Sequence, residues 1–294
     1  MTHPGIAPPG YRLPDETRLD YVSLQIADLE RSLAYYEHTL GLRVLQRAGA
    51  VAMLGTQSGE TPLVELREVA GTQAVGRHAK LGLYHYAILL PHRAALGSFV
   101  QHLAAIGVEV GAADHLVSEA LYLRDPDGLG IEVYTDRPRD TWRVEHQQLV
   151  MATDPLDLAD LVSAANGAPW KGMPEGTVMG HVHLHVGDLD HAAAFYHAGL
   201  GLDKVVWQYP GALFMSAGGY HHHLGLNTWA GRGALPAGEN DARLLEWRMV
   251  LPSETDVSAA AESLQSAGHD ITDDGGDRLA RDPWGTRLRL RSDC

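Results

Sequence analysis

The chain has 294 residues, 45% hydrophobic and 20% charged, a composition typical of a globular protein large enough for two domains. Its formal net charge of −14 argues against nucleic acid or an anionic membrane surface as the main partner. The single cysteine is Cys294, which excludes disulfides within the chain and cysteine-rich zinc sites. We find no signal-peptide pattern and no apolar run long enough to span a bilayer, so we expect a cytoplasmic protein.

The first half of the chain predicts two strand–helix–hairpin units. Residues 1–18 are rich in proline and predict an irregular leader. A strand is then expected at 21–26, a helix that Asp28 caps and Gly41 ends, and hairpin strands at 44–54 and 63–69. The second unit has a strand at 85–90, a helix at 94–106, and strands at 121–124 and 131–134 around an Asp-Pro-Asp-Gly turn.

The second half of the chain repeats the first. After a connection at 138–179, which includes a short helix at 157–165, the same order of elements starts again from His181 and from Glu246. At a constant offset of 160 (181 minus 21), residues of 22–42 recur in 182–202, among them the Asp-Leu pair that starts the helix and the Leu-Gly-Leu that ends it. The turn RDPDG at 124–128 also recurs as RDPWG at 281–285. The sequence therefore predicts a tandem duplication with four βαβββ units and an α+β fold.

One strand of the third unit carries histidine on alternate residues. His181, His183 and His185 alternate with valine and leucine, and successive strand side chains point to opposite faces. All three imidazoles are therefore expected on one face, the other being apolar. This pattern predicts one wall of a metal or substrate cleft.

The four units, the Asp-Leu helix starts and the Asp-Pro-x-Gly turns together resemble the vicinal-oxygen-chelate superfamily, which includes glyoxalase I, bleomycin-resistance proteins and extradiol dioxygenases. Within it, GYHHHLGLNTW at 219–229 is most similar to the two-domain bacterial catechol-2,3-dioxygenases. The resemblance implies two domains, 19–137 and 180–294, each a curled mixed sheet around a cleft with helices outside.

The resemblance also implies a metal site in the second domain. Metal ligands in the family lie on the first and last strands of each unit, which gives His181, a histidine of the 221–223 run, and Glu246. Our preferred ligand from the run is His223, with His221 in reserve, because these two share a strand face and His222 is expected outside the cleft. The first domain offers Tyr21, Glu65, His85 and Glu132 at the corresponding places, and we expect a structural role for them.

Two histidines and one carboxylate are the facial triad of non-haem Fe(II) oxygenases, and Mn(II) suits the same donors. The resemblance then implies ring cleavage of a small aromatic diol with O2 as co-substrate. A general acid or base is needed near the metal, and His221, His183 and His185 are suited to it. We expect substrate contacts from Tyr209, Asn227, Trp229 and Arg289. Tyrosine often precedes the Asp-Pro-x-Gly turn in extradiol enzymes, and Tyr122 does so in the first domain only.

Other readings of the same scaffold stay open. A glyoxalase-like isomerase or a hydroquinone-cleaving enzyme would also bind a metal, although an isomerase site uses a fourth protein ligand, which Arg289 cannot supply because its guanidinium stays protonated. A metal-free resistance protein would sequester a ligand in the cleft. Homo-oligomers are also left open.

Overall fold

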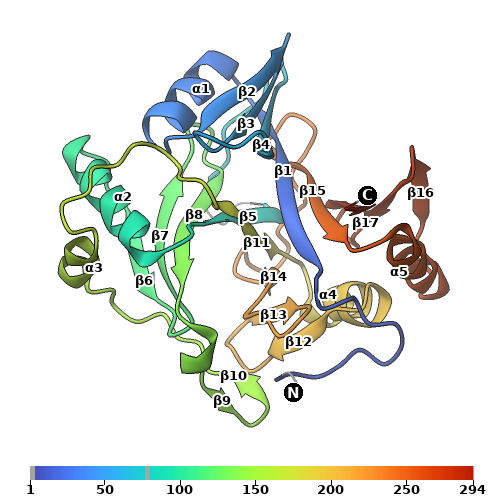
Figure 1. Cartoon of the computed structure of the whole chain (residues 1–294). Coiled ribbons are helices and arrows are strands. Elements are labelled where there is room, and N and C mark those ends of the chain that lie inside the picture. Colours follow the sequence, from blue (N-terminus) through green and yellow to red (C-terminus); the bar gives the residue numbers. More distant parts are fainter. Residues whose placement is uncertain (1–3, 77–79, 294) are drawn as a thin grey trace.

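The computed structural model describes residues 4–76 and 80–293, so Cys294 and the first three residues of the predicted leader lie outside the described residues. Two eight-stranded mixed sheets form most of the molecule, with the helices on their outer sides, and a small two-stranded sheet lies in the connection between the halves (Figure 1). This is the predicted α+β architecture of four βαβββ units. Within the described part of the chain, no helix is long and apolar enough to cross a membrane.

The first half of the chain contains two units. The first has β1 (Arg18–Ile26), α1 (Leu29–His38), β2 (Arg43–Ala48), β3 (Val51–Gly55) and β4 (Pro62–Glu68). The second has β5 (Gly82–Leu89), α2 (Arg93–Ala105), β6 (Gly111–Asp114), β7 (Ser118–Arg124) and β8 (Gly130–Asp136). The connection that follows holds a 3-10 turn (Arg139–Thr141), β9 (Val144–Glu145), β10 (Gln148–Leu149) and the expected short helix, α3 (Leu158–Ala164).

The second half contains the other two units. The third has β11 (Val178–His185), α4 (Leu189–Ala193) continued by a π-helical turn (Ala194–Gly199), β12 (Asp203–Val206), β13 (Ala212–Ser216) and β14 (Leu224–Asn227). The fourth has β15 (Arg243–Leu251), α5 (Glu254–Ser266), β16 (Ile271–Asp274), β17 (Asp277–Arg281) and β18 (Arg287–Ser292).

Local sequence explains how each unit begins. In β1, Val22, Leu24 and Ile26 are fully buried, as strand alternation requires for an apolar face against helices. The Asp28 side chain then accepts a hydrogen bond from the Arg31 N–H, which caps α1. Asp188 caps α4 in the same way by accepting from the His191 N–H. The repeated Asp-Leu pair is therefore a helix start, as predicted.

The two sheets do not follow the two halves of the sequence. One sheet has the order β12-β13-β14-β11-β5-β8-β7-β6 and combines the second and third units. The other has the order β16-β17-β18-β15-β1-β4-β3-β2 and combines the first and fourth. The predicted ranges 19–137 and 180–294 therefore each contribute half of both sheets. One continuous core, which includes Val22 of β1 and Val182 of β11, joins the sheets.

Each sheet is joined at its centre by the first strands of its two units. β5 pairs antiparallel with β11, with His85 opposite His183, and β1 pairs antiparallel with β15, with Ser23 opposite Glu246. Each of these strands also pairs in parallel with the last strand of its own unit, for example β5 with β8. Side chains from two different units thus meet at the middle of each sheet.

Candidate metal centre and cavity

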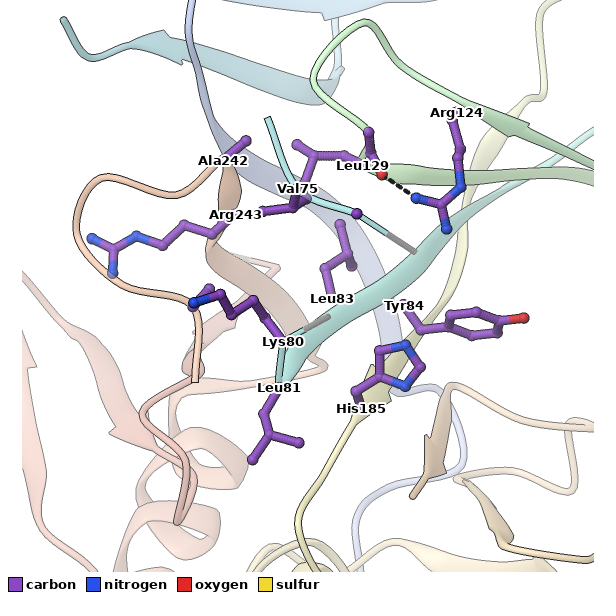
Figure 2. Close-up of a pocket in the computed structure, with 13 residues that line it drawn as sticks. Val75, Lys80, Leu81, Leu83, Tyr84, Arg124, Leu129, His185, Ala242 and Arg243 are labelled. Atoms are coloured by element: carbon purple, nitrogen blue, oxygen red, sulfur yellow. Dashed lines mark hydrogen bonds between the residues drawn. The ribbon is translucent and has the colours of Figure 1, made fainter. Parts of the chain in front are cut away.

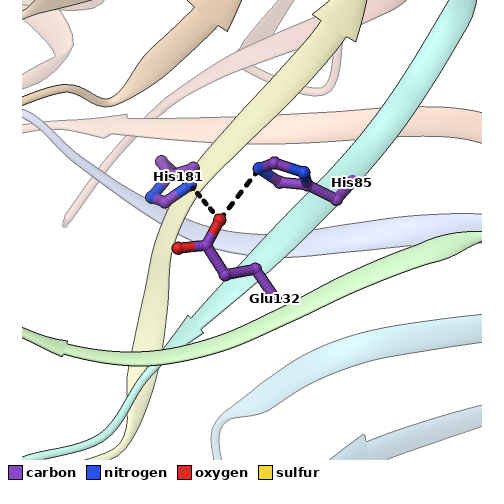
Figure 3. Close-up of side chains that lie close together, drawn as sticks. All are labelled: His85, Glu132 and His181. Atoms are coloured by element: carbon purple, nitrogen blue, oxygen red, sulfur yellow. Dashed lines mark hydrogen bonds and ion pairs between the residues drawn. The ribbon is translucent and has the colours of Figure 1, made fainter. Parts of the chain in front are cut away.

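The centre of the β5–β11 sheet brings together His85 from β5, Glu132 from β8 and His181 from β11 (Figure 3). Glu132 Oε2 lies 3.0 Å from His85 Nε2 and 3.2 Å from His181 Nε2. One potential ligand atom from each of the three residues lies within 4.8 Å of the others, and all three side chains are buried. No larger or second group of this kind occurs among the residues that the structure describes.

Burial sets the protonation of this cluster. It lowers the pKa of both the His85 and the His181 imidazole, which keeps the rings neutral at pH 7. Burial by itself raises the pKa of the Glu132 carboxyl, but the adjacent His181 and His85 outweigh it and hold that pKa well below its usual range. Neutral imidazoles and an ionised carboxylate are the forms that bind a metal.

A cavity of about 410 Å³ opens beside the cluster. His85 and Glu132 line it, as do several aromatic and histidine side chains, namely Tyr84, His115, Tyr122, His183, Tyr209, Phe214, His222 and Trp229. The connection between the halves covers another side of it with Met151, Ala152 and Thr153. Its size and its apolar walls with a few polar groups are typical of a site for a small organic molecule.

Tyr122 and His115 form a hydrogen-bonded pair in this cavity. The Ala152 carbonyl lies 2.7 Å from His115 Nδ1, so Nδ1 carries the proton and donates it, and Nε2 accepts from the Tyr122 hydroxyl at 2.5 Å. Burial, followed by the charge of Glu132, raises the pKa of the Tyr122 hydroxyl well above its ordinary value. Tyr122 is therefore a fixed O–H group beside the cluster. The position of Tyr122 before the Asp-Pro-Asp-Gly turn had indicated a role for this tyrosine, whereas no sequence pattern had pointed to His115.

The three histidines at 221–223 lie differently from the prediction, because they belong to a loop before β14 and not to a strand. Gly218 and Gly219 both have positive φ, at 61° and 65°, and this turn breaks the alternation of faces. His222, expected outside the cleft, lines the cavity, and its ring centroid is 4.0 Å from that of His181. His223, the expected ligand, instead accepts from the Ala217 N–H through Nδ1 at 3.2 Å and packs against Tyr220.

The remaining predicted histidines are held by one amide. His183 lines the cavity, and its Nε2 accepts from Asn227 Nδ2 at 2.9 Å. His185 Nδ1 donates to Asn227 Oδ1 at 2.6 Å. Asn227 thus orients both rings and does not itself line the cavity. His185 lies in a second, smaller cavity of about 30 Å³, which Tyr84 also borders (Figure 2).

Of the predicted substrate contacts, Tyr209 and Trp229 line the main cavity. Tyr209 is tied to the connection by a 2.9 Å hydrogen bond between its hydroxyl and that of Thr153. The Trp229 indole N–H donates to the Pro210 carbonyl at 3.1 Å. Arg289 lies on the other sheet, in β18.

The structure does not bring Glu246 to His181. Glu246 lies in β15 of the other sheet and forms a two-pronged ion pair with Arg289, at 2.6 and 3.2 Å. Nearby, Glu65 accepts from Ser23 Oγ at 2.7 Å and from Arg67 at 3.0 Å. Every carboxylate at the middle of this sheet therefore has a guanidinium partner, which favours a structural role.

The register of the two sheets relates their central positions. The repeat aligns Tyr21 with His181, and by the β1–β15 and β5–β11 pairings Glu246 takes the place of His85. By the same pairings, Arg248 of β15 corresponds to Ala87 of β5. The neighbour of Arg248 on β18 is Arg289 and the neighbour of Ala87 on β8 is Glu132, so Arg289 takes the place of Glu132. The predicted ligands His181 and Glu246 therefore lie on two different sheets, because the third unit pairs with the second and not, as expected, with the fourth.

The fourth central position of the β5–β11 sheet is a glycine. Glu65 lies opposite Ser23, and the corresponding neighbour of His183 is Gly225. A Cβ atom at Gly225 would lie 2.7 Å from His183 Cγ, so the His183 ring fills the space of a side chain there. Of the four corresponding central positions in this sheet, three carry a potential metal ligand, namely His181, His85 and Glu132, and the fourth is Gly225.

Comparison with known proteins agrees with this fold. The sequence model of the family described as the glyoxalase/bleomycin resistance protein/dioxygenase superfamily matches residues 18–133 and 178–290. A curated protein, catechol-2,3-dioxygenase of Bacillus subtilis (strain 168), is 42% identical over 272 residues, which are 92% of this chain and 95% of that protein.

Solved structures show the same arrangement of the chain. A Bacillus subtilis strain 168 protein superposes with a TM-score of 0.66 at 14% identity, over 96% of this chain and 86% of that one. Glyoxalase I from Zea mays gives a TM-score of 0.55 at 19% identity, over 94% and 92% of the two chains. The chain belongs to the glyoxalase/bleomycin resistance protein/dioxygenase superfamily.

Proposed function

We propose that this chain is a metal-dependent extradiol dioxygenase that cleaves the ring of a small catechol-type aromatic diol with O2. The observation that carries the proposal is the buried His85–Glu132–His181 cluster at the wall of an aromatic cavity. The 42% identity to a catechol-2,3-dioxygenase over most of both chains supports the same reaction. We further propose Fe(II) as the ion, with Mn(II) as the alternative for the same donors.

The residues of the cluster fit a metal ion. His85 Nε2 is buried and points at Glu132 without the geometry of a hydrogen bond, as expected for a lone pair that faces a shared ion. Two neutral imidazoles and one carboxylate leave net positive charge on a divalent ion and leave coordination positions for other molecules. When bound, Fe(II) would supply the redox chemistry through which O2 reacts with the diol ring.

The chain's own residues would bind and orient the substrate. Phe214, Trp229 and Tyr84 offer aromatic faces on which a diol ring can pack and from which it displaces water. The Tyr122 hydroxyl stays protonated and donates its hydrogen to His115 Nε2, so its oxygen can accept a hydrogen bond from a hydroxyl of the diol. His115 holds that hydroxyl in place through the contact at 2.5 Å.

The rival activities are less well supported. Glyoxalase-type isomerisation uses a fourth protein ligand, and Gly225 occupies the related position here. Sequestration without metal needs no such cluster, whereas here two buried imidazoles converge on one buried carboxylate, at 3.0 and 3.2 Å. A cytoplasmic location and the oligomeric state stay predictions.

A matched pair of variants tests the metal assignment. Glu132→Gln should lose bound iron and oxygen uptake after anaerobic reconstitution with Fe(II), whereas Glu246→Gln, on the other sheet, should keep both. Iron analysis, oxygen uptake with catechol, and the absorbance of a yellow ring-cleavage product are the measurements. Stoichiometric iron in Glu132→Gln would refute the ligand set.

The same preparation separates the rival functions. Bound metal without oxygen uptake from catechol would favour an isomerase or a hydrolytic enzyme, and uptake with hydroquinone but not catechol would favour para-diol cleavage. No bound metal would favour the sequestering protein.

A further inference from the structure

Behind His222, outside the proposed ligand set, a chain of hydrogen bonds leads away from the cavity to a carboxylate. His222 Nδ1 and His221 Nδ1 are 2.7 Å apart, and His221 Nε2 lies 2.8 Å from Asp136 Oδ1. The His221 side chain is fully buried, whereas Asp136, the last residue of β8, has 27% of its side chain exposed. The chain therefore joins the cavity wall to a partly exposed carboxylate.

The chemistry of these groups fixes the direction of the hydrogen bonds. An ionised carboxylate can only accept, so His221 donates from Nε2 to Asp136. A neutral imidazole carries one N–H, which leaves His221 Nδ1 as an acceptor. His222 must then donate from Nδ1, and its Nε2 is left unprotonated as the one ring nitrogen free to face the cavity that His222 lines.

Other buried or half-buried groups lie against Asp136 and His221. Asp136 Oδ1 also accepts from the Tyr220 hydroxyl at 3.2 Å, and the Tyr134 hydroxyl lies 2.6 Å from that of Tyr220. The Trp142 ring packs edge-on against His221, with centroids 5.4 Å apart. The His221 ring is therefore held by its bond to Asp136 and enclosed by groups that do not reach the cavity.

We propose that Asp136 is a positioning residue that acts through His221, and that the pair fixes His222 with its Nε2 lone pair towards the substrate. His222 then accepts a hydrogen bond from a hydroxyl of the diol and orients that hydroxyl for ring cleavage. This role rests on the proposed dioxygenase function, because it assigns the substrate a hydroxyl at His222. A reversed chain would turn His222 Nε2 into a donor, and the hydroxyl would lose its acceptor.

Two substitutions break the chain at different points. Asp136→Leu removes the carboxylate that sets the direction, and His221→Phe removes the acceptor of His222 Nδ1 but keeps a ring in the buried space. Each should lower kcat for catechol about 10- to 100-fold, the range found when outer-shell partners of active-site histidines are removed. Bound iron should not change, because neither residue contacts His85, Glu132 or His181 by a hydrogen bond.

Non-additivity and a control separate positioning from general damage. The double variant Asp136→Leu/His221→Phe should lose no more activity than the worse single variant, because both act through one chain. Tyr220→Phe removes the other hydrogen bond to the same Asp136 oxygen and should leave kcat within about threefold of the wild type. Additive losses, or an equal loss in Tyr220→Phe, would overturn the proposal.

A spectroscopic readout is independent of turnover. ¹⁵N NMR of the full chain with labelled histidine, before iron is added and assigned with His222→Asn, should show an unprotonated Nε2 at His222 in the wild type. That nitrogen should become protonated, or exchange between two forms, in Asp136→Leu. A protonated Nε2 in the wild type would overturn the inference.

The outcomes distinguish this inference from the function on which it rests. If the wild type does not cleave catechol, the proposed function fails, and with it this role of Asp136. If the wild type cleaves catechol and Asp136→Leu does so at the same rate, only the inference fails. Should Asp136→Leu not fold, His221→Phe decides the question by the same two measurements.

Discussion

Replacement of His223 by asparagine should make the protein more resistant to acid. His223 is 8% exposed, and its burial is the main cause that lowers its pKa from 6.5 to about 3. Asparagine keeps an acceptor for the Ala217 N–H, now held by His223 Nδ1 at 3.2 Å, but cannot take up a proton. The variant therefore isolates the effect of the buried, neutral imidazole.

The sign follows from proton linkage. Between about pH 3 and 6.5 the unfolded chain binds a proton at His223 and the folded chain does not, so this residue makes stability fall as the pH falls through that window. At pH 5.5, one unit below the unfolded pKa of 6.5, the penalty is about 1.4 kcal/mol, and at pH 7.5 it is about 0.1 kcal/mol. His223 thus accounts for about 1.3 kcal/mol of the loss between the two pH values.

Urea unfolding at pH 7.5 and 5.5 measures this difference. Between the two pH values, the free energy of unfolding of the wild type should fall by about 1.3 kcal/mol more than that of His223→Asn, because all other titrating groups are common to both proteins. An equal fall in the two proteins would refute the reasoning, since His223 would then take up its proton equally in the folded and unfolded states.

Three further predictions concern the two sheets and the cavity. Gly225→Ala places a Cβ 2.7 Å from His183 Cγ, so the free energy of unfolding should fall by about 1–3 kcal/mol and kcat should also fall. An unchanged kcat would mean that His183 can move freely. Arg289→Met leaves the buried Glu246 carboxylate without its partner and should cost about 3 kcal/mol in urea unfolding, with iron content and turnover retained; loss of iron would contradict a purely structural pair. The described cavity lining contains neither lysine nor arginine, so a catechol with a ring carboxylate should have a higher KM than methylcatechol, and an equal KM would contradict the cavity assignment.

Patterns that act over a few residues could be read from the sequence. The alternation in β1 and β11, the aspartate caps of α1 and α4, and the repeated Asp-Pro-x-Gly turns each depend on neighbouring residues only. They were sufficient to predict four βαβββ units and, through the resemblance, the superfamily. The repeat and the resemblance also pointed to His181, which lies in the cluster, and two of the four expected substrate contacts, Trp229 and Tyr209, line the cavity.

The loop at 217–223 is a place where local sequence pattern gave the wrong prediction. Strand alternation selected His223 and rejected His222, but Gly218 and Gly219 turn the chain so that His222, and not His223, lines the cavity. A carbonyl oxygen of Asp15, from the leader, lies 2.1 Å from the place of a Cβ at Gly218, so a contact distant in sequence requires the glycine there. A pattern of neighbouring residues cannot predict a contact with a residue so distant in the sequence.

The sequence by itself determined the four units, their internal order and the family, because these follow from local alternation, caps and the repeat. Only the tertiary structure decided that the third unit pairs with the second and the first with the fourth. The first strands of all four units are similar enough for several antiparallel pairings to satisfy their backbones, and packing over the whole core selects among them. That choice places Glu132 and His85 beside His181, and joins Glu246 to Arg289 on the other sheet.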